Sequence, residues 1–351
     1  MKQIFHIVGM MNIGGTETML MNLYRKIDRA KFQFIFVTFG NEKGAYDDEI
    51  IKLGGVIYNA GSPYSFLGFR NLIKKFPNAE IAHIHTYFNC GINALWFTLL
   101  GVNKIISHSH TSLSAEGSLR ASCYEKVCRF LINKLSTEKL ACSQSAAGAL
   151  FGERKNYTYL PNFIDPHPFI KIKNKKTKRS STIQVGHVGR FTEVKNHDFI
   201  IKLACYARQK EYDMCFNLVG GGDLLPAIKA QVEQLELQSY ITFHGTSHNV
   251  PQMMNEFDCF ILPSTVEGFG LVLLEAQASG LPCIVSKAIQ PEAILDLGLV
   301  KYMNFDVEKW VEEIRGTDKK QYSAGDIVTA FSRAGLDFDS VMNRLEEIYE
   351  N

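Results

Sequence analysis

The sequence predicts an α/β protein with two domains, each built on a parallel β-sheet that helices cover on both faces. Three observations predict this class. The 351 residues exceed the roughly 250–300 residues at which a single core normally stops growing. Short β-rich apolar runs alternate with amphipathic stretches, which is the pattern of strand–helix–strand crossovers. This alternation stops at a stretch rich in proline and lysine near the middle of the chain and then begins again.

Apolar runs rich in β-branched residues predict the strands of the first half. We expect them at Ile4–Gly9, Phe34–Phe39, Val56–Asn59, Ile81–His85, Lys104–Ser109 and Lys139–Cys142. Amphipathic patterns such as Thr16–Ile27 and Tyr124–Leu135 predict helices between them. Crossovers of this length make consecutive strands parallel.

The same pattern predicts the elements of the second half. Strands are expected at Ile183–Val188, Cys215–Val219, Ile241–His244, Cys259–Leu262 and Pro282–Val285. Helices are expected near His197–Gln209, Leu225–Leu235, Leu271–Ser279 and Val307–Arg315. The restart of the pattern predicts a second sheet rather than an extension of the first.

Prolines and a basic run separate the two halves and predict the domain boundaries. Pro166 and Pro168 precede a basic run without apolar periodicity that contains Lys171, Lys173, Lys175, Lys176, Lys178 and Arg179. We expect domains over 1–165 and 182–335 with a basic linker over 166–181. The helical spacing in Phe338–Tyr349 predicts that 336–351 form a helix that docks, with the N-terminal domain as one candidate surface. The linker is either solvated or a weak contact for anionic lipid.

Composition excludes several classes of protein. Hydrophobic residues make up 46% and charged residues 21% of the chain, which is typical of a globular protein and not of a disordered one. The 38 basic and 36 acidic residues leave a net charge of +2, so the overall field does not favour a nucleic-acid partner. Any site for an anion must therefore be local.

The cysteines and apolar runs bear on compartment. The eight cysteines include no C-x2-C pair, so they are interpreted as buried thiols in a reducing compartment. The first apolar run is too short for a signal peptide, and Gly91–Val102 is shorter than the roughly 20 residues that cross a bilayer. We expect a cytoplasmic protein, with the inner face of the plasma membrane as a place of peripheral contact.

A glycine turn follows the first predicted strand. Gly9–Thr16, GMMNIGGT, nearly matches the phosphate loop G-x4-G-K-[ST] but has Gly15 in place of the lysine. Without that cation nucleoside triphosphate hydrolysis is not expected. The turn is either a tight strand–helix connection or a place where backbone approaches an anion at a helix N-terminus.

Two cations follow the first strand of the second half. Arg190 and Lys195 lie in VGRFTEVKN, directly after Ile183–Val188. Ligands of open α/β sheets bind beyond the carboxyl ends of the strands. Together these cations can neutralise a diphosphate, although an isolated pair of this kind is more often simply solvated.

The segment from Pro263 to Pro282 combines glycines with two glutamates. If a helix begins near Gly270, Glu267 lies in the loop before it and Glu275 lies about one and a half turns inside it. The free amides at the helix start favour a diphosphate, while the glutamates repel phosphate but bind hydroxyls. A ligand with an anionic centre and polyhydroxyl ends, a nucleotide sugar, suits this mixture.

These residues resemble a known family. EGFGLVLLEA is similar to the E-x7-E element of the retaining glycosyltransferases of family 4, which have the GT-B fold of two Rossmann-like parallel-sheet domains facing each other across a cleft. The resemblance extends in order through GGTE at Gly14–Glu17, HSHT at His108–Thr111, PNFID at Pro161–Asp165, GRFTEVKN at Gly189–Asn196 and VGGGD at Val219–Asp223. Bacterial exopolysaccharide and capsule enzymes look similar.

The resemblance implies roles for the C-terminal domain, which would bind the nucleotide sugar, while the N-terminal domain would bind the acceptor. Arg190 and Lys195 would hold the diphosphate and stabilise the departing charge. Glu267 would bind the hydroxyls of the transferred sugar, and Glu275 those of the ribose. The resemblance also places backbone contacts to the donor at Phe269, Gly270, Leu271, Gly221, Gly222 and, in the N-terminal domain, Gly15. VGGGD departs from the usual G-[DE]-G of the family.

Histidines alternate along two predicted strands of the first half. His110 matches the family position near the reacting sugar, where its carbonyl or ring would stabilise the cationic centre or position the acceptor, and His85 would line the acceptor side. His83 and His108 are interpreted as satisfied residues near strand ends. The competing hypothesis is a metal site from the two H-x-H pairs, since residues two apart on a strand share a face. We expect no metal and no other cofactor.

The resemblance therefore implies a metal-independent retaining enzyme that moves a sugar from a nucleotide sugar, by family frequency a UDP-sugar, to a glycan or lipid-linked oligosaccharide in exopolysaccharide or capsule synthesis. Two alternatives stay open. One is a sugar-nucleotide epimerase of the hydrolysing 2-epimerase type with the same fold, and the other is a non-catalytic partner subunit of another transferase. No nucleic-acid partner is expected.

Overall fold

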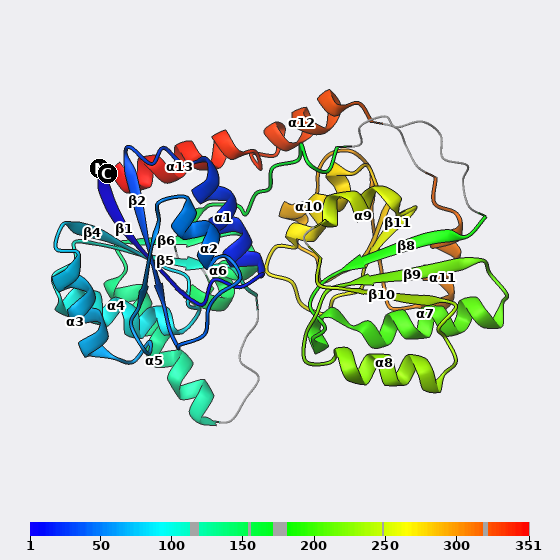
Figure 1. Cartoon of the computed structure of the whole chain (residues 1–351), viewed down its shortest axis with the longest axis horizontal. Helices are drawn as coiled ribbons and strands as arrows, with labels where there is room; N and C mark the ends of the chain where they lie inside the picture. The colour runs from blue at the N-terminus through cyan, green and yellow to red at the C-terminus, as the bar shows by residue number, and fades with distance from the viewer. Residues whose placement is uncertain (113–118, 154–155, 171–180, 248, 319–321, 351) are drawn as a thin grey trace. The chain divides into compact units, whose positions relative to one another are not determined.

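The computed structural model describes residues 1–112, 119–153, 156–170, 181–247, 249–318 and 322–350. The chain forms two compact units (Figure 1). Unit 1 consists of Met1–Phe163 together with Phe338–Asn351, and unit 2 consists of Ile164–Asp337. The basic run at 171–179, for which a solvated and a lipid-binding interpretation were both open, lies outside the described residues.

Unit 1 is built on a seven-stranded parallel sheet with the strand order β3-β2-β1-β4-β5-β6-β7. Its strands are β1 (Lys2–Gly9), β2 (Phe32–Thr38), β3 (Val56–Asn59), β4 (Ala79–Ile84), β5 (Lys104–Ser109), β6 (Glu138–Ala141) and β7 (Thr158–Tyr159). Its helices are α1 (Gly15–Lys26), α2 (Asp47–Lys52), α3 (Phe66–Lys75), α4 (Asn89–Leu99), α5 (Leu119–Leu135), α6 (Gln144–Phe151) and α13 (Phe338–Glu350).

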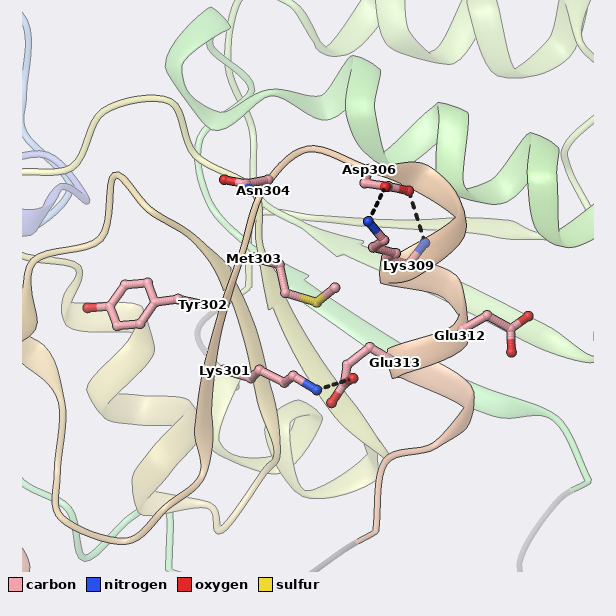
Figure 2. Close-up of a pocket in the computed structure, with 8 residues that line it drawn as sticks. All are labelled: Lys301, Tyr302, Met303, Asn304, Asp306, Lys309, Glu312 and Glu313. Carbon is pink, nitrogen blue, oxygen red and sulfur yellow. Dashed lines mark hydrogen bonds and ion pairs between the residues drawn. The ribbon is translucent and has the colours of Figure 1, made fainter.

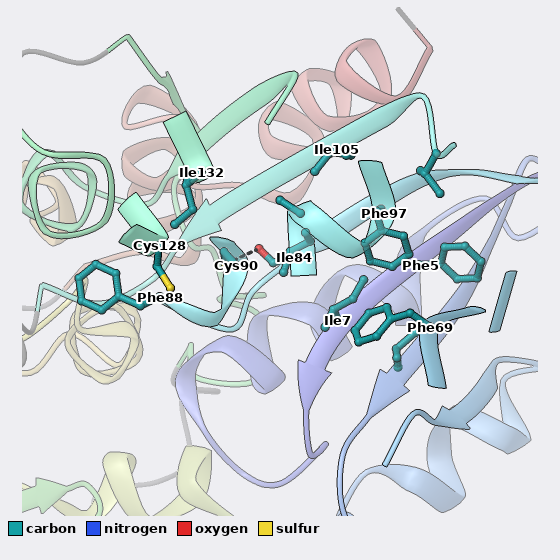
Figure 3. Packing of buried hydrophobic residues seen from close by; sticks show 14 of the residues in the cluster. Phe5, Ile7, Phe69, Ile84, Phe88, Cys90, Phe97, Ile105, Cys128 and Ile132 are labelled. Carbon is teal, nitrogen blue, oxygen red and sulfur yellow. Dashed lines mark hydrogen bonds between the residues drawn. The ribbon is translucent and has the colours of Figure 1, made fainter. Parts of the chain in front are cut away.

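The two faces of this sheet carry different side chains because residues alternate along each strand. On one face Phe5 stacks on Phe97 of α4 with ring centroids 5.8 Å apart, and Phe69 of α3 meets Phe97 edge-on at 5.2 Å. Figure 3 shows these rings beside the aliphatic side chains of Ile7 and Ile84. This face forms an apolar core.

The other face of the sheet is covered by α1 and α13. Tyr24 of α1 stacks on Phe34 of β2 at 5.3 Å, and Tyr349 of α13 lies 5.8 Å from Phe32. Lys2 Nζ donates to the backbone carbonyl of Tyr349 over 2.9 Å. The last helix of the chain therefore packs on the first strand, so unit 1 is assembled from both ends of the sequence.

Unit 2 repeats the architecture with a six-stranded parallel sheet in the order β10-β9-β8-β11-β12-β13. Its strands are β8 (Ile183–Val188), β9 (Met214–Val219), β10 (Ile241–Gly245), β11 (Cys259–Leu262), β12 (Cys283–Ser286) and β13 (Val300–Met303). Its helices are α7 (His197–Gln209), α8 (Leu225–Gln234), α9 (Val250–Glu256), α10 (Leu271–Ala278), α11 (Val307–Arg315) and α12 (Ala324–Arg333), with short 3₁₀ turns η1 (Glu193–Lys195) and η2 (Pro291–Ala293).

The predicted α/β class with two parallel sheets is confirmed, and several strands have the predicted bounds. Two edge strands are additional. β7 has two residues, too few for a periodicity, and β13 is VKYM with two exposed central residues, so it lacks the continuous apolar run of a buried strand.

Both sheets reverse their strand order at a comparable place. In unit 1 the reversal lies between β1 and β4, and in unit 2 it lies between β8 and β11. The connections on the two sides of such a point run to opposite faces of the sheet, which leaves a crevice at the carboxyl ends of the two central strands. Ligand sites are expected there.

Two further expectations concern the membrane and the cysteines. Among the described residues, no helix is both long and apolar enough to cross a bilayer. The interpretation of the cysteines as buried thiols is correct for Cys90, Cys128, Cys142, Cys259 and Cys283. It is wrong for Cys123, which is exposed on α5, because an isolated cysteine carries no sequence signal of burial.

Candidate functional site

The loops after β8 and β11 meet at the strand-order reversal of unit 2. The Thr265 amide donates to the Val194 carbonyl over 2.8 Å, which joins the two loops through their backbones. Lys195 Nζ forms an ion pair with Glu267 Oε1 across the same junction. Their side chains are 17% and 11% exposed, so the pair is shielded yet reachable from solvent. The structure thus brings together two residues that the sequence predicts to serve one ligand.

Glu267 is held from two further directions. Ser264 Oγ donates to Glu267 Oε1 over 2.8 Å, and Gln290 Nε2 donates to the Glu267 backbone carbonyl over 3.1 Å. Sequence reasoning missed both partners. Ser264 belongs to the motif that carries Glu267, but a serine three residues before a glutamate indicates no contact by itself, and Gln290 lies beyond the next strand.

Arg190 and Lys195 are presented differently. The Arg190 side chain is exposed and makes no hydrogen bond or ion pair with any residue that the structure describes. Lys195 ends the short turn η1, and its side chain passes Gly189, where an added Cβ would lie 3.5 Å from Lys195 Cδ. Arg190 is therefore a free cation beside a paired one.

Glycines allow the loop after β9 to press against the loop after β8. Gly222 has a φ of +146°, and a Cβ there would lie 2.7 Å from the Phe191 carbonyl oxygen. A Cβ on Gly220 would overlap the Gly189 carbonyl oxygen. The Phe191 amide donates to the Gly221 carbonyl over 2.8 Å. These glycines hold the cationic loop in place, and direct contact of Gly221 and Gly222 with a donor stays a prediction.

A buried histidine supports the same loop. His187 on β8 donates from Nδ1 to the Ile261 carbonyl over 3.0 Å, and a Cβ on Gly189 would lie 3.3 Å from its Nε2. Burial, followed by the nearby His197, lowers the pKa of His187 to about 3. The loop that carries the cations therefore rests on a neutral ring, which adds no competing positive charge.

Helix α10 begins as the sequence predicts. Gly270 caps it in a left-handed conformation, with a φ of +92° that favours glycine. Phe269 and Leu271, on either side, are buried side chains, so any contact of these residues with a ligand would come from their backbone. The first amides of the helix have no partner within it, and the helix dipole favours an anion there.

Glu275 lies inside α10 with a perturbed acidity. Burial raises the pKa of its carboxyl to about 8. No described residue donates a hydrogen bond to it or pairs with it in an ion pair. A carboxyl that is neutral near pH 7 can both donate and accept hydrogen bonds, as hydroxyl ligands require.

In unit 1, Gly15 and the predicted histidines lie near the carboxyl ends of the central strands. Gly15 is the exposed first residue of α1, and a Cβ there would meet no atom within 4 Å. His85 follows β4 and His110 follows β5, and a 2.9 Å hydrogen bond joins His85 Nδ1 to His110 Nε2. His110 Nδ1 bonds Asn162 Oδ1 at 3.2 Å.

These bonds constrain what the two histidines can do. Both ring nitrogens of His110 are occupied by hydrogen bonds within the protein, so any contact with a ligand would come from its backbone. His85 is 9% exposed and also bonds His6 Nδ1 through its Nε2 at 3.1 Å. Its ring is therefore committed to the protein, and a role on the acceptor side would be indirect.

An open pocket in unit 2 lies elsewhere, along β13 and α11 (Figure 2). Lys301 pairs with Glu313 at 2.5 Å and Lys309 with Asp306 at 3.1 Å. The residues that line it are Lys301, Tyr302, Met303, Asn304, Asp306, Lys309, Glu312 and Glu313. None of them is a predicted site residue, and the pocket lies at the sheet edge rather than at the strand-order reversal.

Comparison with known proteins matches both halves of the chain. A family model described as Glycosyltransferase Family 4 matches residues 13–167, and one described as Glycosyl transferases group 1 matches residues 168–315. The protein named glycosyltransferase EpsF of Bacillus subtilis is 36% identical over 373 aligned positions, covering 99% of this chain and 96% of EpsF. CapH of Staphylococcus aureus, named a capsular polysaccharide biosynthesis glycosyltransferase, is 24% identical and covers 99% of both chains.

Solved structures support the fold. Anabaena HepE in complex with UDP and glucose is similar with a TM-score of 0.81 over 100% of both chains, at 17% identity. Its complex with UDP-glucose gives a TM-score of 0.79. The near-complete match to EpsF, the two family models and this shared architecture lead to one assignment. The chain belongs to glycosyltransferase family 4 and has the GT-B fold of two Rossmann-like domains.

Proposed function

We propose that this glycosyltransferase acts in polysaccharide biosynthesis and transfers a sugar from a UDP-sugar to a glycan or lipid-linked acceptor with retention of configuration. The observation that carries the proposal is the meeting of Lys195 and Glu267 at the strand-order reversal of unit 2, beside the start of α10. The cation and the helix N-terminus suit the diphosphate of a nucleotide sugar, and the carboxylate suits the hydroxyls of its sugar.

The ion pair gives a physical route for donor binding. Without donor, Lys195 and Glu267 satisfy each other, and Ser264 holds the carboxylate in place. A diphosphate that takes the ammonium of Lys195, with Arg190 beside it, releases Glu267 to accept hydrogen bonds from the sugar. The two groups are thus kept in position without rearranging the loops that carry them.

Glu275 is proposed to bind the ribose. Its carboxyl is neutral near pH 7 because burial raises its pKa to about 8. Ribose hydroxyls offer donors and acceptors to such a group without adding charge to the diphosphate site. Backbone groups at Phe269, Gly270 and Leu271 are proposed to contact the phosphate and sugar.

The proposed reaction needs no metal. The bond between the anomeric carbon and the phosphate oxygen breaks while the acceptor oxygen forms its new bond on the same face. The acceptor proton passes to the departing phosphate oxygen. Arg190 and Lys195 stabilise the charge that develops on that phosphate. Such electrostatic stabilisation is usually the largest single contribution that an enzyme makes to the reaction rate. The His110 carbonyl stabilises the cationic sugar.

Several names among similar proteins support parts of the proposal. HepE is described in complex with UDP, UDP-glucose and glucose, which favours uracil as the base of the donor. CapH is named for capsular polysaccharide biosynthesis, which favours a glycan or its lipid-linked precursor as acceptor. The epimerase and non-catalytic alternatives are not favoured, because the relatives are named glycosyltransferases and the cationic and acidic site residues are all present.

A panel of nucleotide sugars tests the donor assignment by thermal stabilisation. A bound donor at 100 times its dissociation constant should stabilise the folded protein by about 2.7 kcal/mol. UDP-sugars should stabilise it and the matched GDP-sugars should not. Incubation of the donor alone should leave it intact, because release of UDP with epimerised sugar would indicate the 2-epimerase. Activity that EDTA removes and zinc restores would contradict the metal-independent mechanism.

A second experiment concerns the membrane. We propose that the enzyme works in the cytoplasm, with weak contact at the anionic inner face of the plasma membrane. Flotation with vesicles of phosphatidylglycerol and phosphatidylcholine should recover the protein at low salt and lose it at high salt. Equal recovery with pure phosphatidylcholine would remove the electrostatic contact.

A further inference from the structure

Five histidines of unit 1 form one hydrogen-bonded chain with Tyr349 and Asn162. From the half-buried end, Asn162 Oδ1 meets His110 Nδ1 at 3.2 Å, His110 Nε2 meets His85 Nδ1 at 2.9 Å, and His85 Nε2 meets His6 Nδ1 at 3.1 Å. His6 Nε2 meets the Tyr349 hydroxyl at 3.5 Å, the longest link. The hydroxyl meets His83 Nδ1 at 2.7 Å, and His83 Nε2 meets His108 Nδ1 at 3.1 Å.

This hydrogen-bonded chain constrains the tautomer of each histidine ring that belongs to it. A neutral imidazole has one N–H donor and one acceptor nitrogen, and a tyrosine hydroxyl can donate one bond while it accepts another. The rings of His110, His85, His6 and His83 use both nitrogens. Once the direction of one bond is set, all the others follow, so only two arrangements exist: every ring carries its proton on Nδ1 or every ring carries it on Nε2.

The two ends select the first arrangement. At one end the Asn162 carbonyl oxygen must accept, so His110 Nδ1 donates. At the other end His108, 1% exposed, has an Nε2 without a hydrogen-bond partner among the described residues. A hydrogen bond with the Leu160 backbone raises the pKa of His108, but burial and the neighbouring rings outweigh it. A buried bare acceptor costs less than a buried unpartnered N–H, which the reverse direction would create.

The surroundings favour neutral rings. Burial lowers the pKa of His6 to about 3 and that of His110 to about 4. For His83, His85 and His108, burial and then the mutual repulsion of the neighbouring rings hold the pKa well below its usual value. Phe34 packs on His6 with ring centroids 4.1 Å apart.

A metal ion is the competing occupant. Nitrogens of His6, His83 and His85, or of His85, His108 and His110, lie within 4.8 Å of one another. Apart from the lone pair of His108 Nε2, a divalent ion would need lone pairs that already accept hydrogen bonds in the chain. It would also bring two positive charges into a buried place where neither group of ligands contains an acidic residue. The hydrogen-bonded chain satisfies these nitrogens without charge, except His108 Nε2.

We propose that Tyr349, His6 and His85 are positioning residues for His110, and that the chain holds the five rings as neutral Nδ1–H tautomers. Its catalytic consequence rests on the proposed function, in which the His110 carbonyl stabilises the reacting sugar. The chain fixes the His110 ring at both nitrogens and hence its backbone at the end of β5. Tyr349 supplies the central link, so the last helix supports a residue at the site without touching the substrate.

Tautomers in the unliganded wild-type protein test the chain without any activity. Long-range ¹H–¹⁵N correlation spectra of protein labelled with ¹⁵N-histidine should show five neutral Nδ1–H rings at pH 7. A charged ring or an Nε2–H tautomer at any of the five positions overturns the proposal. So does a set of ring signals that one equivalent of Zn²⁺ shifts together. This outcome is independent of whether the enzyme transfers sugar.

The Tyr349→Phe variant tests the catalytic consequence. It removes the central hydroxyl and should lower kcat about tenfold or more, with the donor KM unchanged, because His110 is no longer held in place. Tyr24→Phe is the matched control, since Tyr24 is equally buried in unit 1 and stacks on Phe34 but lies outside the chain. It should keep wild-type kcat and the five tautomers.

Counts of active sites by single-turnover burst keep this test separate from misfolding. A purely structural role would reduce the number of active sites and leave kcat per active site unchanged, which overturns the positioning role. Wild-type kcat in Tyr349→Phe does the same. If the variant yields no folded protein, the tautomers of the wild type still decide whether the chain exists. Absence of transfer by the wild type with every donor would contradict the proposed function instead.

Discussion

The two sheets of this protein share a topology but carry opposite chemistry at the place where their strand order reverses. In unit 2 the loops beyond β8 and β11 hold the Lys195–Glu267 ion pair, which is partly open to solvent. In unit 1 His6 on β1 and His85 just after β4 are buried and belong to a chain of neutral rings. Unit 2 therefore has charged side chains at its strand-order reversal, whereas unit 1 has buried, uncharged ones.

The difference shows what the fold does and does not decide. A parallel sheet with a strand-order reversal supplies a place for a ligand, and the residues in the loops then decide which ligand fits. Separated cations and carboxylates suit a diphosphate with hydroxyl-rich ends. A chain of rings that donates and accepts internally has little to offer an ion, but it can hold one residue at its end in a fixed orientation.

The largest effect is expected from a change in the charged site of unit 2. Lys195→Ala should lower kcat at least 10²-fold, because it removes a cation that stabilises the departing phosphate. Steady-state kinetics with the best donor measures the effect, and circular dichroism checks the fold. Lys202→Ala, an exposed lysine on the following helix α7, is the matched control and should retain wild-type kcat. Near-normal turnover in Lys195→Ala would refute the diphosphate role.

A second change in unit 2, at Glu275, should affect the stability of the folded protein and its binding of the donor in opposite directions. Above pH 4.5 the unfolded chain loses the Glu275 proton, while the folded protein keeps it until about pH 8. The folded state therefore binds more protons in this window, and its stability falls as the pH rises. Glu275→Gln removes this penalty and should raise the free energy of unfolding by a few kcal/mol at pH 8 and by little at pH 4.

The same variant should bind the donor more weakly, since an amide replaces the carboxyl proposed to hold the ribose. Urea unfolding at the two pH values and calorimetry with UDP measure the two effects. Equal stabilisation at both pH values would show that desolvation of the carboxyl does not matter. Unchanged affinity would remove the ribose role.

A smaller effect tests the packing that holds the cationic loop. Gly220→Ala should destabilise unit 2 by about 2 kcal/mol or more, because its Cβ overlaps the Gly189 carbonyl oxygen and the backbone must shift. Gly148→Ala is the control in helix α6 of unit 1, where a Cβ meets no atom within 4 Å. It should stabilise the protein by about 0.5–1 kcal/mol. Thermal unfolding followed by calorimetry compares them, and a tolerated Gly220→Ala would contradict the close approach.

The histidine chain of unit 1 provides a further test. Tyr349→Phe should lower the free energy of unfolding by about 1–3 kcal/mol. Without the hydroxyl, the buried His83 Nδ1–H loses its acceptor and His6 Nε2 loses its donor. Tyr24→Phe should cost less, because its hydroxyl makes one long bond of 3.5 Å to the Leu53 carbonyl, whereas the Tyr349 hydroxyl also makes the 2.7 Å bond to His83. If urea unfolding shows that both variants lose the same free energy of unfolding, the Tyr349 hydroxyl does not stabilise the protein through the histidine chain.

The sequence predicts much of the fold and the charged site because both depend on local patterns. Strands such as Ile183–Val188 and Lys104–Ser109 follow from apolar runs, and the left-handed start of α10 follows from Gly270. That Lys195 and Glu267 lie near each other could be predicted because each follows a strand at the same end of one sheet, but their ion pair is seen only in the structure. The roles of Ser264 and Gln290 could not be predicted, since they depend on side-chain geometry.

The histidine chain shows more clearly what the sequence cannot predict. The H-x-H pairs predict that His83 and His85 share a face, and likewise His108 and His110. The interpretation of His83 as a satisfied residue agrees with its two bonds. Nothing local indicates that His6 joins the same face, and Tyr349 closes the chain from 266 residues beyond His83. Such contacts arise only from tertiary packing.

The discontinuity of unit 1 has a consequence for how the protein is made. Helix α13 (Phe338–Glu350) leaves the ribosome after every residue of unit 2, yet it packs on the first strand. Domains usually fold in the order of synthesis. Here the histidine face of unit 1 stays uncovered by α13 until all of unit 2 has been synthesised, so unit 2 can complete its core before unit 1 does.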